Sequence, residues 1–380
     1  MKLVLVQPLL PSYDISFFNR VAELHPEIEM VLLADIETTN SLNQYRAEPC
    51  KFKVRHLASV DWKGLTFRPG LLKLLAQEGA DATVVFSANP RDVSQLWAML
   101  VQRLQRRRFF AWGMFHRIGG LRLVSRFYYR IVGRLATRCL TYTRVGASTL
   151  LNLGVSKEKI GIVGTAIDER LPLAQREAKS PEQLEAFRWQ QGLAGKHIIL
   201  QVVRLSRIKR PELLVQAAEL MLRQRQDLLF VLIGDGEMRQ ELESQVKARG
   251  MERAFRFLGA IYDETILAYW YLSADAFVVP TCIGLSAHQA MCYGVPIVTD
   301  DSLDCQASEF DILADGLNAV TYAEGDIASL ARAIERVVGD PELREFLSRN
   351  ATFSVRNIHS IGRKSQNFVK LVSSTKRPHE

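Results

Sequence analysis

The chain has 380 residues, more than one hydrophobic core usually organises, so two domains are expected. Hydrophobic residues make up 48% of the sequence and charged residues 24%, a composition that excludes intrinsic disorder, collagen and coiled coil. The five cysteines are an odd number, and no pair of CxxC motifs is present. These features argue against a disulfide framework and a zinc site and favour a reducing compartment.

The N-terminal apolar run is too short for a secretory signal, and no stretch approaches the ~20 apolar residues of a membrane span. Positive charge is concentrated in residues 103–144, which contain eleven arginines and no Lys, Asp or Glu. Because the net charge of the chain is +8, the rest of the chain is net negative. Five arginines recur at every fourth position and share one broad helical face beside Phe127 and Tyr128. They are Arg122, Arg126, Arg130, Arg134 and Arg138.

Three interpretations of this basic helix stay open. The arginines form a solvated face that covers apolar surface, a patch that binds an anionic membrane, or a nucleic-acid patch. No recognition-helix motif, RNA-binding signature or zinc finger accompanies the charge, so no nucleic acid is expected as a partner. We expect a cytoplasmic protein attached peripherally to the inner face of the membrane through Arg122, Arg126 and Arg130.

Short apolar segments alternate with helical patterns along the whole chain. The expected strands are Lys2–Gln7, Glu29–Ala34, Lys51–His56, Ala82–Ser87, Arg108–Gly113, Leu140–Thr143, Ile198–Val203, Leu229–Gly234, Phe255–Leu258, Ala276–Val279, Ile297–Thr299 and Ala319–Tyr322. The clearest helical patterns are Pro211–Gln224, Glu237–Arg249, Glu264–Ser273 and Ile327–Val338. Uniformly apolar strands are typical of parallel sheets that are buried on both faces. The pattern predicts an α/β protein with doubly wound sheets.

The strand–helix pattern starts afresh after a polar stretch at residues 178–195. We therefore expect a first Rossmann-like domain over residues 1–170, a second over 171–360, and a C-terminal helix and tail over 361–380. Ligands of such folds bind beyond the carboxyl ends of the strands. With two such domains facing each other, a cleft between them is the expected site.

Two cations follow the strand that ends near Arg204. Arg204 and Lys209 border a strand-to-helix turn, and Pro211 suits the start of the helix that follows. Two cations at such a turn suit a diphosphate. Ordinary surface basicity is the alternative, and it is the preferred interpretation of Arg207 and Arg210.

A glycine precedes a second helix. The strand Ala276–Val279 leads into a loop with Gly284, and a helix is expected over Leu285–Tyr293, stopped by Gly294. Glycine at this point lets a phosphate approach the free amides of the first turn. A plain strand–turn–helix unit is the alternative.

The carboxylates of residues 300–311 follow the next strand. Adjacent aspartates in an extended loop point apart, and no histidine pair supports them, so neither a metal nor a cofactor is expected.

Taken together these stretches resemble family 4 of the retaining glycosyltransferases, which have the two-domain GT-B fold. The family's G-R-L-x-x-x-K turn appears at residues 203–209, its V-G-x-G at 232–236, its F-x-G at 257–259, its A-D-x-F-V-x-P-S at 274–281, and its G-L-x-x-x-E-A-M-A-x-G-x-P-V-V at 284–298. The order and spacing of these motifs are specific, although no single one is decisive.

The resemblance also implies the donor site. The family's paired glutamates fall on Thr281 and Gln289, so both carboxylates are missing. Gln289 can still bond the ribose through its amide, and glutamate should be tolerated there. Glu309 matches a later family glutamate and is expected to face the donor. The donor-binding residues are expected to be Gly234, Gly284, Leu285, Ser286, Gln289, Thr281 and Glu309.

The N-terminal domain departs further from the family pattern. Residues 8–14 are similar to the P-x-Y-R-x-P-F-F opening of a branch of bacterial polysaccharide enzymes, with Asp14 where arginine is common. Tyr13 and Asp14 are expected to contact the acceptor. His116 lies two residues from the position of the branch's W-G-H-G histidine, and it is either catalytic or structural.

The resemblance implies a retaining, metal-independent hexosyltransferase of cell-surface polysaccharide synthesis. It would use a nucleotide-sugar donor and a glycan or lipid-linked glycan acceptor. Arg204 and Lys209 would stabilise the departing diphosphate. A GT-B pseudoenzyme that only binds, and a GT-B sugar-nucleotide epimerase, are the alternatives.

Overall fold

The computed structural model describes residues 1–35 and 48–374. The chain forms two compact units, one of Met1–Asp168 with Ile361–Glu380 and the other of Glu169–Ser360. These boundaries lie close to the predicted ones, but the C-terminal helix is part of the first unit. The end of the predicted tail, residues 375–380, lies outside the described residues.

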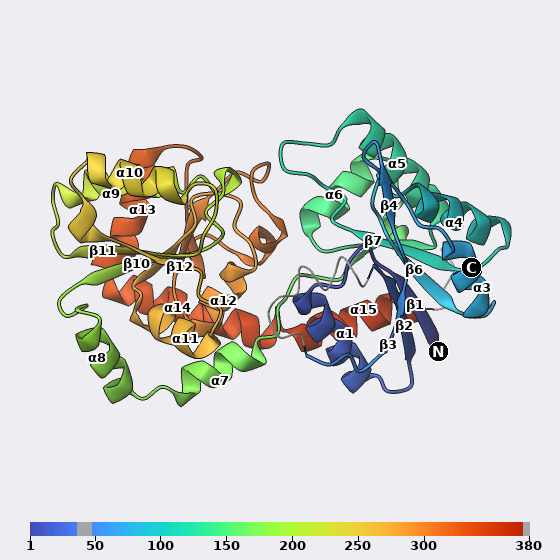
Figure 1. Cartoon of the computed structure of the whole chain (residues 1–380), viewed down its shortest axis with the longest axis horizontal. Coiled ribbons are helices and arrows are strands. Elements are labelled where there is room, and N and C mark those ends of the chain that lie inside the picture. Colours follow the sequence, from blue (N-terminus) through green and yellow to red (C-terminus); the bar gives the residue numbers. More distant parts are fainter. Residues whose placement is uncertain (36–47, 375–380) are drawn as a thin grey trace. The chain divides into compact units, whose positions relative to one another are not determined.

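The first unit contains a seven-stranded parallel sheet in the order β3-β2-β1-β6-β7-β8-β9 (Figure 1). The strands are β1 (Lys2–Val6), β2 (Glu29–Ala34), β3 (Lys53–His56), β6 (Thr83–Ser87), β7 (Phe109–Gly113), β8 (Arg138–Thr141) and β9 (Ile160–Ile162). The helices are α1 (Ser12–Leu24), α3 (Leu71–Gln77), α4 (Val93–Leu104), α5 (Leu123–Leu135), α6 (Arg144–Asn152) and α15 (Ile361–Ser373), with the 3-10 helix η1 (Lys157–Lys159).

Both faces of this sheet are covered by helices, because its strands carry apolar side chains on both faces. α1 and α15 pack on one face, and α3, α4, α5 and α6 pack on the other (Figure 1). α15 is held to α1 by an aromatic cluster, in which the ring centroid of Phe17 lies 5.6 Å from that of Phe368 and 5.6 Å from that of Trp112. The strand order reverses between β1 and β6, which is where ligands of doubly wound sheets bind.

The second unit contains a six-stranded parallel sheet in the order β12-β11-β10-β13-β14-β15. The strands are β10 (His197–Val202), β11 (Leu228–Ile233), β12 (Phe255–Gly259), β13 (Ala276–Val278), β14 (Ile297–Asp300) and β15 (Ala319–Tyr322). The helices are α7 (Arg170–Ala178), α8 (Pro181–Gln190), α9 (Glu212–Leu222), α10 (Arg239–Ala248), α11 (Glu264–Ser273), α12 (Ser286–Tyr293), α13 (Ile327–Gly339) and α14 (Pro341–Asn357), with the 3-10 helices η2 (Arg207–Lys209), η3 (Glu252–Ala254) and η4 (Ser308–Ile312).

Both faces of the second sheet are also covered, so the predicted doubly wound α/β class is confirmed. α9, α10 and α13 pack on one face, and α11 and α12 pack on the other (Figure 1). The strand order reverses between β10 and β13. The carboxyl ends of these two strands therefore mark the expected ligand site of this unit.

The structure differs from the prediction at several short elements. β9 and the antiparallel hairpin of β4 (Val60–Trp62) and β5 (Leu65–Phe67) were not predicted, because three-residue strands carry too little periodicity. The hairpin turn has φ of 49° at Lys63 and 79° at Gly64, as a two-residue turn requires. The polar stretch at residues 178–195 belongs to the second unit and contains α8.

The predicted basic helix is shorter than expected. α5 ends at Leu135, so Arg138 lies in β8, where its guanidinium donates to the carbonyl oxygens of Glu158 and Leu371. Tyr128 is buried, whereas Phe127 is 67% exposed. Four of the five arginines remain at or in α5, with Arg122 as its N-cap residue. In the part of the chain that the structure describes, no helix combines the length and the apolar composition that crossing a bilayer requires.

Candidate functional site

A lysine joins the carboxyl ends of the two strands at which the second sheet reverses its order. Lys209 lies in η2, beyond β10, and its ammonium donates to the carbonyl oxygen of Cys282 in the loop after β13. Gln201 in β10 also donates to the carbonyl oxygen of Val278 in β13, at 3.2 Å. Arg204 follows β10 by two residues and is exposed. The predicted pair of cations therefore lies at the expected edge of the sheet.

Gly284 leaves room for the ammonium group. A Cβ atom at Gly284 would lie 3.3 Å from the Lys209 Nζ, closer than most side-chain contacts. Gly284 is followed by Leu285, which is the N-cap residue of α12, and by Ser286, its first residue. The N-cap makes no side-chain hydrogen bond to the first turn. The Ala287 amide donates to the Gly284 carbonyl oxygen at 2.9 Å, so an anion next to Lys209 would meet the remaining amides of the first turn and the positive end of the helix dipole.

Two glycines let the loop after β11 pack against the Arg204 loop. Gly234 has a φ of 140°, and a Cβ atom there would lie 1.8 Å from the carbonyl oxygen of Val203. Gly236 has a φ of 156°, and its Cβ atom would lie 2.3 Å from the carbonyl oxygen of Leu205. Gly234 was predicted to bind the donor. What the structure shows is that its missing side chain allows the two loops to pack closely.

We expect Gly234→Ala to lower the free energy of unfolding by at least ~2 kcal/mol, because the methyl group meets backbone and the left-handed φ is strained. The matched control is Gly195→Ala. Gly195 has a φ of 67° and no other atom within 4 Å of its Cβ position, so it reports the conformational cost alone. Denaturant unfolding of both variants measures the difference. Equal losses for both variants would contradict the packing role of Gly234.

The loop after β13 is held by a residue that the sequence analysis missed. Cys282 has a φ of 52°, a strained value for a residue other than glycine. The next amide, of Ile283, donates to the Oε1 of Gln306 at 2.7 Å. The Nε2 of Gln306 donates to Thr299 and to the Oδ1 of Asp300, at 2.8 and 2.9 Å. Gln306 thus ties the strained loop to the end of β14.

Carboxylates border the same loop. Burial raises the pKa of Asp300, against hydrogen bonds from Thr281, the Ser302 amide and Gln306. Glu309 is buried in η4. Burial raises the pKa of the Cys282 thiol; Lys209 opposes this rise, and the carboxylates of Glu309 and Asp300 add to it. Thr281 belongs to the loop after β13, and Lys209 and Glu309 lie beside that loop. Three residues that were predicted separately therefore come together there.

Gln289 is engaged on both sides of its amide. Its Nε2 donates to the Oε2 of Glu264 at 2.8 Å, and its Oε1 accepts from the hydroxyl of Tyr271 at 3.2 Å. A glutamate at this position would face the Glu264 carboxylate at that distance, which costs energy because like charges repel. From this contact we predict that glutamate at position 289 is unfavourable, contrary to the expectation from the sequence.

The predicted residues of the first unit also lie beyond carboxyl strand ends. Asp14 is in the first turn of α1, which follows β1, and Tyr13 beside it is 48% exposed. Burial raises the pKa of Asp14 to about 6, against the opposing charge of Lys364. His116 is half-buried beyond β7, and β6 separates β1 from β7 in the sheet.

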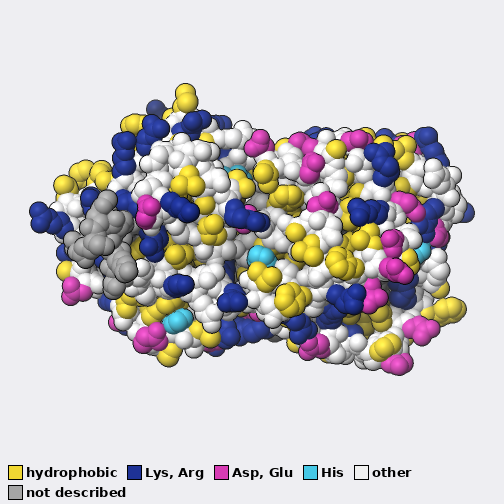
Figure 2. Space-filling model, turned by 180° about the vertical axis from the view of Figure 1, so that it is seen from behind, with side chains coloured by type: hydrophobic (Ala, Val, Ile, Leu, Met, Phe, Trp, Pro, Cys, Tyr) yellow, Lys and Arg dark blue, Asp and Glu magenta, His cyan; other side chains and the backbone are white. Residues whose placement is uncertain are grey.

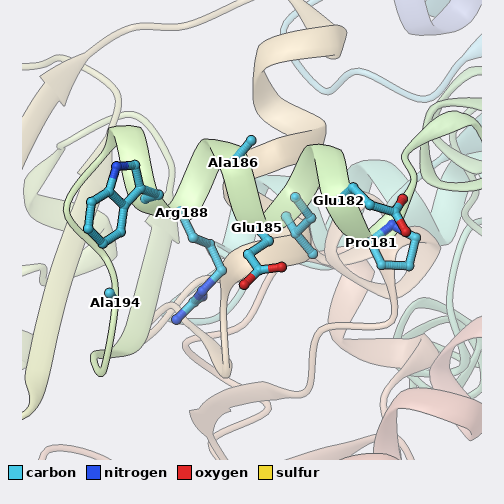
Figure 3. A pocket seen from close by; sticks show the side chains of 8 residues that line it. Pro181, Glu182, Glu185, Ala186, Arg188 and Ala194 are labelled. Atoms are coloured by element: carbon cyan, nitrogen blue, oxygen red, sulfur yellow. The ribbon is translucent and has the colours of Figure 1, made fainter.

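A separate hollow lies along α8 (Figure 3). It is lined by Pro181, Glu182, Glu185 and Ala194 among others. Arg188, which also lines it, donates to the carbonyl oxygens of Ser273, Leu193 and Lys196. Ala194 stands just before β10, so this end of the hollow lies at the amino end of that strand. Within residues 1–35 and 48–374, no group of three or more His, Cys, Asp or Glu is placed to hold a metal ion.

Comparison with known proteins finds a family match within the second unit. Residues 184–352 match the family described as Glycosyl transferases group 1. HepE of Anabaena, solved in complex with UDP, superposes with a TM-score of 0.75 over 98% of this chain and 100% of its own, at 16% identity. The likeness shows the fold, which is that of GT-B proteins, with two Rossmann-like domains.

Curated relatives match about half of this chain. Alpha-D-kanosaminyltransferase of Streptomyces kanamyceticus is 29% identical over 181 residues, which cover 47% of this chain and 45% of that protein. The GalNAc-alpha-(1->4)-GalNAc-alpha-(1->3)-diNAcBac-PP-undecaprenol alpha-1,4-N-acetyl-D-galactosaminyltransferase of Campylobacter jejuni is 28% identical over 191 residues, 48% of this chain and 49% of its own length. The chain thus spans about half the length of these relatives. The names of both relatives are those of glycosyltransferases.

Proposed function

We propose that this chain is a glycosyltransferase that moves a hexose-type sugar from a nucleoside diphosphate donor to a glycan acceptor, with retention of the anomeric configuration. The observation that carries the proposal is the contact of Lys209 with the Cys282 carbonyl, beside Gly284 at the start of α12. This arrangement offers an ammonium group and the amino end of α12 to one anion, within a unit that matches the group 1 family.

The chemistry follows from this charge arrangement. The bond between the anomeric carbon and the donor phosphate oxygen breaks, and the acceptor oxygen forms a bond to the same face of that carbon. The acceptor proton passes to the departing phosphate oxygen. Arg204, Lys209 and the α12 amides stabilise the charge that develops on the diphosphate. No protein carboxylate needs to take the proton, and no metal is required for the charge, so neither a metal nor a cofactor is proposed.

The first unit is proposed to bind the acceptor, with Tyr13, Asp14 and His116 at its carboxyl strand ends. The exposed side of α5 supports an acceptor that is lipid-linked. Leu123 is 83% exposed, Val124 75% and Phe127 67%, next to the exposed Arg122 and Arg126. Figure 2 shows hydrophobic and basic side chains side by side on the molecular surface. Apolar and cationic residues on one helix suit the surface of an anionic bilayer.

We therefore propose that the enzyme works on the inner face of the membrane, in cell-surface polysaccharide synthesis. The relative from Campylobacter jejuni carries PP-undecaprenol in its name, which agrees with a lipid-linked acceptor.

The experiment that tests the proposal is a thermal-shift screen over UDP-, GDP- and dTDP-sugars, because a bound ligand stabilises the folded state by mass action. At 100 times the Kd, stabilisation is about 2.7 kcal/mol, which is readily measured. We expect sugars of one nucleotide class to raise the melting temperature. A chain that none of these donors stabilises would contradict the proposed function.

A further inference from the structure

Two helices of the second unit meet through a group of four polar side chains. Glu264, at the start of α11, accepts a hydrogen bond from the Nε2 of Gln289 at 2.8 Å and one from the hydroxyl of Tyr293 at 2.6 Å. The hydroxyl of Tyr271 donates to the Oε1 of Gln289 at 3.2 Å. Gln289 and Tyr293 belong to α12, whose first turn lies next to Lys209. The group therefore connects α11 to the helix that begins at the proposed diphosphate site.

These contacts assign both ends of the Gln289 amide. A carboxylate only accepts hydrogen bonds, so the side of the amide that faces Glu264 must be the NH₂ group. Burial raises the pKa of the Tyr271 and Tyr293 phenols well above their usual range, so both hydroxyls stay protonated donors. The two rings stack with centroids 5.0 Å apart and an interplanar angle of 9°, which fixes where the hydroxyls lie.

An oriented amide leaves a defined pair of groups for a ligand. After the contacts to Glu264 and Tyr271, Gln289 retains one N–H donor and one lone pair on its oxygen. Gln289 and Glu264 are both half-buried, so part of this surface reaches solvent. One donor and one acceptor in fixed order match two adjacent hydroxyl groups, such as those of a ribose.

We propose that Glu264 is a positioning residue for the donor: together with Tyr271 it fixes the Gln289 amide in the orientation that binds the ribose hydroxyls of a nucleoside diphosphate. This inference rests on the proposed function. It assigns a role to a carboxylate that lies 25 residues from Gln289 in the sequence. It also explains why this position holds an amide, since a second carboxylate would face Glu264 directly.

The test exchanges the two side chains. Gln289→Glu should weaken binding of UDP or GDP, whichever the wild-type chain binds, by about tenfold or more, equal to ~1.4 kcal/mol. The double variant Glu264→Gln with Gln289→Glu restores one amide and one carboxylate. Because hydroxyl groups donate as well as accept, the carboxylate at position 289 can still hold both ribose hydroxyls, and the Kd should return to within about threefold of wild type. The effect should fall on the donor KM, with kcat changed little. The matched control is Gln245→Glu on α10, where the Gln245 Nε2 lies 3.4 Å from the exposed Glu241 carboxylate.

Each outcome decides between the possibilities. If the wild type binds a nucleoside diphosphate and Gln289→Glu binds it equally well, the inference is overturned while the proposed function stands. If the double variant recovers its melting temperature but not its affinity, Glu264 is only structural. If the wild type binds none of UDP, GDP and dTDP, the proposed function fails first, and the role of Glu264 toward a donor fails with it. If it binds only dTDP, which lacks the 2′-hydroxyl, the proposed function stands and the ribose role is overturned.

Discussion

Turnover of Arg204→Ala should fall by at least about a hundredfold, because the lost charge acts on the departing diphosphate in the transition state. Arg204 is exposed just beyond β10, so its removal leaves no cavity in the core, and the variant should fold. Donor binding should weaken less than turnover, since the charge on the leaving group is greatest in the transition state. Steady-state kinetics with varied donor concentration separates the two effects.

Arg207→Ala is the matched control for this experiment. Arg207 lies three residues further along the chain in η2, with its guanidinium exposed and 3.5 Å from the Glu241 carboxylate. Exposed ion pairs contribute little to stability, so this change should leave turnover within a few-fold of wild type. Near-normal turnover of a folded Arg204→Ala, or equal losses in both variants, would remove the assignment of Arg204 to the diphosphate.

Binding of the protein to anionic vesicles should fall by about two orders of magnitude or more when Arg122 and Arg126 are both changed to Glu. Each basic residue near an anionic surface is worth ~1 kcal/mol, and reversal of the charge replaces attraction by repulsion. Arg130 is left unchanged because its guanidinium donates to the carbonyl oxygen of Leu153 at 3.1 Å and therefore supports the fold. Sedimentation with vesicles of anionic and of neutral lipid measures the effect.

The control is the pair Arg332→Glu and Arg336→Glu on α13, which has the same spacing and exposure in the second unit. Its vesicle binding should stay close to that of the wild type. High salt should release the wild-type protein. Exposed charges are screened beyond ~8–10 Å at physiological ionic strength, and this screening length becomes shorter as the salt concentration rises. A wild-type protein that ignores anionic vesicles at low salt would contradict the membrane role and leave α5 as a solvated face.

Much of the fold could be predicted from the sequence because buried parallel strands form continuous apolar runs. Leu3, Leu5 and Leu32 are fully buried, and each stands in a predicted strand. The polar stretch at residues 178–195 was harder to interpret. Its Ser180 and Gln183 form a capping box at the start of α8, a signal that is visible in the sequence but was outweighed by the polar composition around it.

Part of the candidate site could be predicted because some of its residues lie in local sequence patterns. Arg204, Lys209 and Gly284 lie at strand-to-helix turns, and the local pattern alone indicates an anion there. Gln306 and Glu264 were missed because they act through contacts to Ile283 and Gln289 that lie 23 and 25 residues away in the sequence. No periodicity or short motif encodes such contacts. The sequence led us to expect that glutamate is tolerated at position 289, and the structure leads us to predict the opposite, because the Glu264 carboxylate was not visible as its neighbour.

The central claim is that this chain transfers a sugar with retention and without a metal. The most direct measurement incubates the wild-type protein, in excess EDTA, with the donor that stabilises it and with a lipid-linked glycan, and follows the products by NMR. We expect the nucleoside diphosphate and an extended glycan in equal amounts, with the anomeric configuration of the donor kept in the new linkage. An epimerised nucleotide sugar, binding without turnover, an inverted linkage, or activity restored only by manganese or magnesium would each contradict this account.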